Sequence, residues 1–416
     1  MENEFIDKMF NNNLIHINGD LQYSPLKTLF GEIQSAYNNL NRLTITRQDS
    51  AKGMAAILSD IQQHSGNYLP IPIIDSIKQN YLGTMHVVEV DIGPMINTKK
   101  CDIKLSFYKM NDNPIMQNTL ELYSNVMISW LIVAKKYEGA ECLKNLTVDI
   151  YLTKERKLLN TNVGELYDAN GGTHRAQQTH GNETQAQQQA HGNETQALGS
   201  NNVNTALTYR CVHGKSIILL YRSEDLIKTF FHETFHTLSL DFENAAKKEV
   251  KHIFNINSPL RLFESYCETW ARIVNSMYYV ILLNPNMKWQ AFNKNFKVVL
   301  SIESIYSAIQ CCKILNYMDL TYDDVLSNNV FDKFKETSNV FSYYVITAII
   351  MMNPTQFLSF CNNDNNILKF NKSKLQEYIQ FLSKARYTSN IKTVETHLDK
   401  FTYKKSLRMA IFDIKN

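Results

Sequence analysis

The sequence predicts an α+β fold with a small mixed sheet, because strand-type and helix-type patterns occupy different parts of the chain. Residues 85–92, 102–108 and 146–152 resemble strands, and the first two alternate clearly between apolar and polar side chains. From residue 258 onward, almost every stretch has apolar residues at helical spacing instead. We therefore expect a sheet built from the middle of the chain and a mostly helical C-terminal half.

The pattern divides the chain into three expected regions. Residues 1–80 look mainly helical, since apolar residues such as Leu26 and Phe30 recur at helical spacing. Residues 81–257 form an expected α/β subdomain, and residues 258–416 an expected helical subdomain. At 416 residues, the chain is long enough for one large domain or two ordinary ones.

The elements of the middle region are expected in a definite order. Residues 115–137 have the length and periodicity of a long, buried helix. Residues 206–212 and 216–221 are two strand-type runs around Gly214, which predicts a β-hairpin. Ser223 is the expected cap of the helix that follows. The later helices are expected over 260–283, 286–296, 299–315, 335–352, 354–361, 372–385 and 390–400.

One segment of the middle region differs in composition from its surroundings. From about residue 171 to residue 204 the chain is rich in Gln, Asn, Gly and Thr, and it repeats HGNETQA. Such a segment has too few apolar side chains to form a core. We predict a disordered insertion here, whose histidines are solvated rather than bound to metal.

Composition excludes several classes of protein. The net charge of +3 is too small to indicate a nucleic-acid partner, and the apolar runs are too short to predict a membrane span. The N-terminal residues lack the pattern of a secretory signal, and the seven cysteines show no paired spacing. We expect a cytoplasmic protein with reduced thiols. Nothing in the sequence indicates its oligomeric state.

The stretch His232-Glu233-Thr234-Phe235-His236 is the strongest chemical motif in the chain. Two histidines four residues apart on a helix project from the same face, so both can bind one zinc ion. Glu233 is then close enough to act on a water molecule at that metal without binding the metal itself. The motif alone has a substantial false-positive risk, since a surface helix can carry two unrelated histidines.

A second predicted helix supplies candidates for a third metal ligand. Its sequence suggests that Ser258 caps it and that Pro259 takes its first position. The helix carries Glu264 and Glu268 one turn apart, and Glu268 has Arg272 four residues later as a possible partner.

We therefore assign Glu264 as third ligand. Glu268 is expected to hydrogen-bond a metal-binding histidine, His232 or His236, or to be the alternative ligand. Asp241 could also bind the metal, although a hydrogen bond to a neighbouring histidine fits it better.

The pair HETFH and ESYCETWA resembles the gluzincin metallopeptidases, in which a glutamate on a second helix follows a helical HExxH motif. More narrowly, residues 146–280 resemble uncharacterised HExxH proteins of large cytoplasmic DNA viruses. The resemblance departs from the gluzincin pattern at Ser265 and Cys267, where Gly and Ala are usual, and at Trp270, which comes one residue late. It implies a zincin-like fold, one Zn2+ ion, and a peptide or protein substrate.

The resemblance implies a mechanism in which Glu233 is the general base and one further group stabilises the oxyanion. The candidates for that group are Tyr266, Tyr278, Tyr279, Tyr343, Tyr344 and Arg222. Two other interpretations stay open: a zinc-binding virion or assembly protein without catalytic activity, and a helical interaction protein with a coincidental motif. The sequence does not distinguish endopeptidase from exopeptidase.

Overall fold

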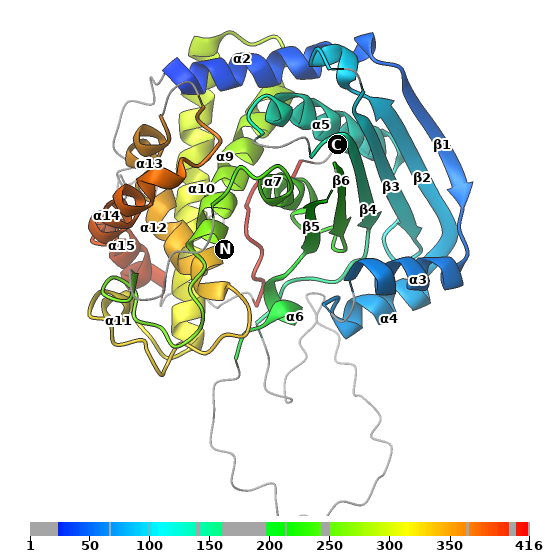
Figure 1. Ribbon diagram of the computed structural model, residues 1–416. Helices are drawn as coiled ribbons and strands as arrows, with labels where there is room; N and C mark the ends of the chain where they lie inside the picture. The colour runs from blue at the N-terminus through cyan, green and yellow to red at the C-terminus, as the bar shows by residue number, and fades with distance from the viewer. Residues whose placement is uncertain are drawn as a thin grey trace, which may run out of the picture.

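A six-stranded mixed sheet forms one side of the computed structural model (Figure 1). The strands lie in the order β1-β2-β3-β4-β6-β5. Their bounds are β1 Ile45–Ala51, β2 Tyr81–Asp91, β3 Asp102–Met110, β4 Asn145–Tyr151, β5 Ala206–Val212 and β6 Lys215–Leu220. The structure describes residues 24–65, 68–98, 100–138, 142–159, 197–212, 214–242, 250–362, 366–398 and 405–414.

The sheet is antiparallel at both edges and parallel in the centre. β1, β2 and β3 pair antiparallel, whereas β3, β4 and β6 run parallel. β5 returns antiparallel along β6 and is an edge strand of the sheet. The predicted α+β class, the mixed sheet and the hairpin are therefore confirmed.

Helices make up most of the described chain outside the sheet. The first group is α2 Ser24–Asn38, α3 Met54–Ser65, α4 Ile71–Asn80, α5 Gln117–Lys135, α6 Ser200–Val203 and α7 Leu226–Thr237. The second is α9 Leu262–Leu283, α10 Trp289–Tyr317, α11 Tyr322–Leu326, α12 Thr347–Met351, α13 Pro354–Cys361, α14 Leu375–Ala385 and α15 Ser389–Leu398. A π-helix, η3 Phe341–Ile346, leads into α12, and the 3-10 turns are η1 Leu40–Arg42, η2 Gly93–Met95 and η4 Lys372–Lys374.

The helix α7 lies between the sheet and α9, with α5 also packed against it (Figure 1). Trp130 of α5 packs edge-on against Phe231, and its indole N–H donates a hydrogen bond to Thr234 Oγ1 at 2.7 Å. Phe231 stacks on Tyr278 of α9 with ring centroids 5.2 Å apart. These buried aromatic contacts fix α7 against α5 and α9, so its remaining face keeps a defined position.

Several element boundaries differ from the sequence-based expectation. β1 is a strand within the region predicted to be mainly helical, because its whole length pairs with residues 84–90 of β2. Two predicted helices, 286–296 and 299–315, form the single helix α10. The helix expected from residue 335 starts only with the π-helix η3.

Both predicted helix caps are wrong. Helix α7 begins at Leu226, and Ser223 donates its hydroxyl to the Thr153 carbonyl oxygen instead. Helix α9 begins at Leu262, and the Ser258 hydroxyl donates to Glu336. In both cases the serine hydroxyl, which the local sequence predicts to cap the helix, is hydrogen-bonded to a residue distant in sequence instead.

Part of the predicted disordered insertion is ordered. Leu198 is fully buried, and its N–H donates to the Lys335 carbonyl oxygen at 3.1 Å. The short helix α6 follows and leads directly into β5. The expectation of disorder is therefore wrong for residues 197–204, while residues 171–196 lie outside the described residues.

By length and composition alone, α10 could cross a membrane, but 83% of its apolar window is buried inside the structure. Buried core helices of soluble proteins satisfy the same criterion. Its apolar surface is covered by α9, α12 and α15, so protein contacts account for it.

A buried carboxylate attaches residues 405–414 to the start of α7. Asp225 accepts hydrogen bonds from Arg408 Nε at 3.1 Å and from the Met409 N–H at 2.7 Å, and it also pairs with Lys157. Burial raises the pKa of Asp225, but Lys157 and Arg408 outweigh burial and hold that pKa below its usual range. The ionised form is therefore the stable one in the folded protein.

We expect Asp225→Ala to lower the free energy of unfolding by about 3–5 kcal/mol, because it leaves buried cations without their partner. The lowered pKa adds stability above the unfolded-state pKa, and this contribution disappears as the pH falls toward the folded-state pKa. Urea unfolding at neutral pH measures the change. The matched control is Asp323→Ala, since Asp323 is 69% exposed and pairs only at the surface with Lys392. Its loss should stay within about 1 kcal/mol, and equal losses for both variants would contradict the expectation.

Candidate metal centre

The helix α7 presents His232, Glu233 and His236 on the face that the aromatic contacts leave free. Ser239 then adopts a left-handed backbone conformation with φ 53°, and the Leu240 N–H bonds back to the Phe235 carbonyl oxygen at 2.9 Å. This arrangement ends the helix and reverses the chain. Asp241 is brought back against His236 as a result.

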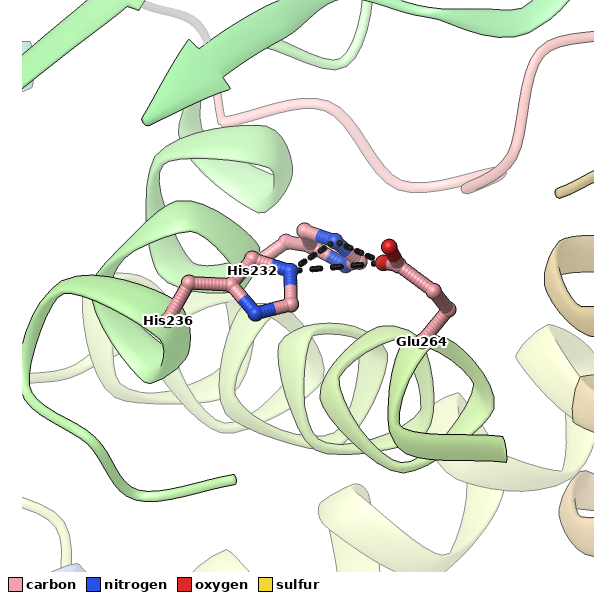
Figure 2. Close-up of side chains that lie close together, drawn as sticks. All are labelled: His232, His236 and Glu264. Atoms are coloured by element: carbon pink, nitrogen blue, oxygen red, sulfur yellow. Dashed lines mark hydrogen bonds and ion pairs between the residues drawn. The ribbon is translucent and has the colours of Figure 1, made fainter. Parts of the chain in front are cut away.

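Three atoms from two helices converge at one point (Figure 2). The Nε2 atoms of His232 and His236 lie 3.1 Å apart, and Glu264 Oε2 of α9 lies 3.3 Å from each of them. In a tetrahedral zinc site with zinc–nitrogen bonds of 2.0–2.1 Å, neighbouring ligand atoms are separated by about 3.3–3.4 Å. The triangle therefore has the size that a small divalent metal ion requires.

Carboxylates behind the two imidazoles orient their lone pairs. His236 Nδ1 lies 2.8 Å from Asp241 Oδ2, and His232 Nδ1 lies 3.2 Å from Glu268 Oε2. An ionised carboxylate only accepts hydrogen bonds, so each contact favours the proton on Nδ1 and a lone pair on Nε2. Both lone pairs then point at the carboxylate oxygen of Glu264.

Such a cluster of acceptors needs a cation. Glu264 Oε2 is buried and makes no hydrogen bond, while Oε1 accepts one from Asn339 Nδ2 at 3.1 Å. Burial raises the pKa of Glu264, but His236 and His232, in their protonated form, outweigh burial and lower it overall. Three electron-pair donors facing one another away from water are stable when a cation lies between them. This buried group of His232, His236 and Glu264 could bind a metal ion.

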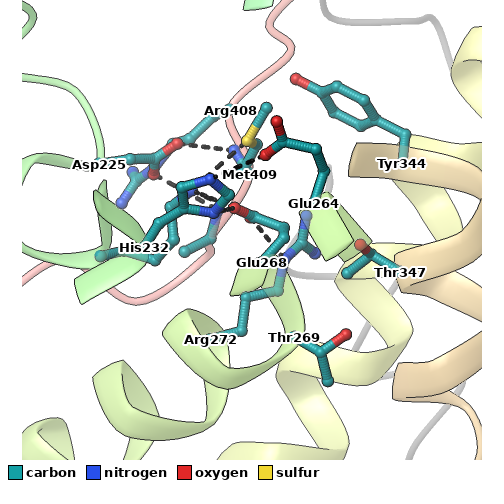
Figure 3. A network of polar contacts seen from close by, with 12 residues as sticks. Asp225, His232, Glu264, Glu268, Thr269, Arg272, Tyr344, Thr347, Arg408 and Met409 are labelled. Atoms are coloured by element: carbon teal, nitrogen blue, oxygen red, sulfur yellow. Dashed lines mark hydrogen bonds and ion pairs between the residues drawn. The ribbon is translucent and has the colours of Figure 1, made fainter. Parts of the chain in front are cut away.

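The structure separates the two glutamates of α9 by environment. Both carboxylate oxygens of Glu268 accept hydrogen bonds from Lys228 Nζ, at 3.0 and 2.8 Å. One of them also accepts a hydrogen bond from Arg272 Nε at 3.0 Å (Figure 3). Burial raises the pKa of Glu268, but Lys228, His232 and Arg272 outweigh burial and lower it well below its usual value. Glu268 therefore lies behind His232 as an anion, and Glu264 lies at the convergence point.

Cys267 and Asp241 give a second grouping around His236. The thiol sulfur of Cys267 lies 3.8 Å from His236 Nδ1, on the side of the ring away from Glu264. Burial raises the pKa of this thiol to about 12. Since the grouping shares His236 with the first one, we treat it as the surroundings of the same centre.

Glu233 lies beside the metal group and next to the edge strand. Its Oε2 accepts a hydrogen bond from Thr208 Oγ1 of β5 at 2.5 Å. Glu233, His232 and Tyr343 line one small cavity of about 50 Å³. This is room for a few water molecules beside Glu233 and His232.

Among the six candidates for an oxyanion donor, the structure brings Tyr343 to this cavity. Its ring lies edge-on to His232 with centroids 5.8 Å apart. The other five candidates contact residues elsewhere. Three donate hydrogen bonds to main-chain carbonyl oxygens: Tyr266 to Leu368, Tyr344 to Leu407 and Arg222 to Asn201. Tyr278 shares a hydrogen bond with Ser129, and the ring of Tyr279 packs on Phe412.

Four residues of the centre escaped the sequence analysis. Asn339, Met409 and Thr208 belong to none of the motifs described above. Lys228 does not either, and it pairs with Glu268 on another helix. No local spacing signals such contacts, because the partners are 25 to 181 residues apart.

The chain matches no family model, and no curated protein or solved structure matches it.

We expect the purified full chain to bind one Zn2+ ion per molecule, and Glu264→Gln to weaken this binding by at least about 100-fold, since it removes an anionic ligand. Metal analysis after dialysis against a graded chelator series measures the change. His397→Ala, on α15, is the control and should leave binding unaltered. If Glu264→Gln and His397→Ala retain the same amount of zinc, the assignment of Glu264 is wrong.

Proposed function

We propose that this protein is a zinc-dependent peptidase of the gluzincin type, with His232, His236 and Glu264 as zinc ligands. The observation that carries the proposal is the position of Glu233, which lines the same cavity as His232. A structural zinc site has no need of a free carboxylate, whereas a hydrolytic site requires a base beside an open metal position.

A zinc ion at this position supplies a Lewis acid that polarises a water molecule and the scissile carbonyl group. Glu233 accepts the proton of that water and later donates it to the leaving amine. The hydrogen bond from Thr208 holds one carboxylate oxygen of Glu233, so the other oxygen is left for this transfer. Asp241 and Glu268 keep the two imidazoles in the tautomer that ligation needs.

The edge strand β5 supports a peptide substrate. In the sheet of the described residues β5 has a neighbour on one side only, and Thr208 connects it directly to Glu233. An extended peptide can add to such an edge through main-chain hydrogen bonds. Binding there would bring a backbone carbonyl close to Glu233, with Tyr343, which lines the same cavity, as the candidate donor to the developing oxyanion.

One observation favours a second candidate, a zinc-binding protein without catalytic activity that serves in a virion or in assembly. The cavity of about 50 Å³ does not accommodate a peptide in this conformation. A peptidase must widen it by moving residues around Tyr343 or Met409, whereas a structural protein need not. Activity measurements distinguish the two candidates.

Glu233→Gln should lower the rate of peptide cleavage by about 10²–10⁴-fold and leave the zinc content unchanged, because it removes the base but no metal ligand. Cleavage of a degenerate peptide library and metal content are measured on the same preparation. Unchanged cleavage would exclude Glu233 as the base. A wild-type protein that binds zinc but cleaves no peptide would favour the second candidate.

Tyr343→Phe should lower kcat by about 10²-fold or more with zinc content unchanged, since it removes one donor to the oxyanion. Tyr344→Phe is a closely matched control, because its hydroxyl donates to the Leu407 carbonyl oxygen at 2.6 Å and Tyr344 is not among the residues that line the cavity. Steady-state kinetics of both variants decide the role. Equal effects would assign Tyr343 to packing.

A further inference from the structure

A small set of polar groups lines the cavity beside the metal group and takes no part in the mechanism above. Lys228 and Thr229 belong to the first half of α7, and Met409 belongs to residues 405–414. Thr229 lies three residues before His232 and four before Glu233, so all three share one face of the helix. The group therefore borders the position where a substrate side chain next to the scissile bond would lie.

The donors of this group are not fully used. The Lys228 ammonium has three N–H groups, two of which bind Glu268. The third meets only the thioether sulfur of Met409, at 3.4 Å. A thioether is a weak acceptor, so a substrate oxygen could replace it with a gain in hydrogen bonding.

Thr229 adds a second donor. Its side chain is buried, and its hydroxyl makes no hydrogen bond within the described residues. A buried hydroxyl without a partner costs free energy, which a bound acceptor would recover. Lys228 and Thr229 thus offer one N–H and one O–H to the same small space.

The charges around Lys228 favour an anion. Lys228 and Arg272 share the single carboxylate of Glu268. The next carboxylate, Glu303, lies 4.0 Å from Arg272, and burial raises its pKa to about 7. Burial lowers the pKa of Lys228, and the nearby carboxylates of Glu268 and Asp225 oppose that shift, so a further carboxylate bound beside Lys228 would also stabilise its charged form.

We propose that Lys228 and Thr229 form a subsite for a small acidic side chain, so that the enzyme prefers peptides with aspartate next to the scissile bond. The inference rests on the proposed peptidase function and adds its substrate class. A cavity of about 50 Å³ suits a short side chain rather than a long one. A bound carboxylate would replace the Met409 sulfur as the partner of the third Lys228 N–H group.

The experiment uses the zinc-loaded full chain and peptides that differ at one position flanking the bond, carrying Asp, Asn or Leu. Leu has nearly the shape of Asp without its oxygens. We expect kcat/KM to be about 10- to 100-fold higher for Asp than for Leu, with Asn between them. Equal cleavage of the Asp and Leu peptides would overturn the subsite while leaving the peptidase function intact. No cleavage of any peptide would overturn both.

Variants assign the preference to these residues. Thr229→Val should reduce the ratio of Asp to Leu cleavage by about 5- to 10-fold, and Thr229→Ser should restore it. Lys228→Met should bring the ratio of Asp to Leu cleavage close to one. If Lys228→Met does not fold, Thr229→Val still tests the subsite. The control is Thr46→Val on β1, at the opposite edge of the sheet from β5. A ratio that stays the same in Thr229→Val and Thr46→Val would exclude Thr229 from the subsite.

Discussion

Three electron-pair donors held within 3.3 Å of one another away from water are the constraint around which the two central helices are arranged. Such an arrangement has a high free energy unless a cation lies between the atoms. The packing of α7 against α5 and α9 supplies the rigidity that keeps the donors together, through Trp130, Phe231 and Tyr278. The position of the candidate ligands therefore depends on the apolar core, since neither helix can shift without separating them.

On the side of His232 away from Glu264, buried charged side chains also connect separate elements of the fold. Glu268 connects His232 to Lys228 and Arg272, and Asp225 connects the start of α7 to residues 408–410. Each carboxylate has more than one cationic or N–H partner, which is how buried ions become tolerable. The side of α7 that carries chemistry is thus stabilised by polar contacts and the opposite side by aromatic ones.

Local patterns predicted the parts of this structure that depend on local spacing. The α+β class, the hairpin and the helix of His232 follow from periodicities of two and 3.6 residues. The proximity of Glu264 to the histidines agrees with the choice made from its lack of a partner at i+4. Ser223 and Ser258 were misjudged and the role of Lys228 was not foreseen, because each has a partner on a distant element. The order of Leu198 was missed since one buried leucine hardly changes a polar composition.

The attachment of residues 408–410 to Asp225 has a consequence for biogenesis. These residues follow the start of α7 by more than 180 positions, yet they provide two of the main-chain N–H groups that Asp225 binds and the thioether that Lys228 meets. During synthesis the ribosome has released helices α7 and α9 long before this segment emerges. A nascent or prematurely terminated chain therefore has the candidate ligands but lacks the segment that completes their surroundings. The order of translation itself delays maturation of the centre until nearly all of this sequence has been made.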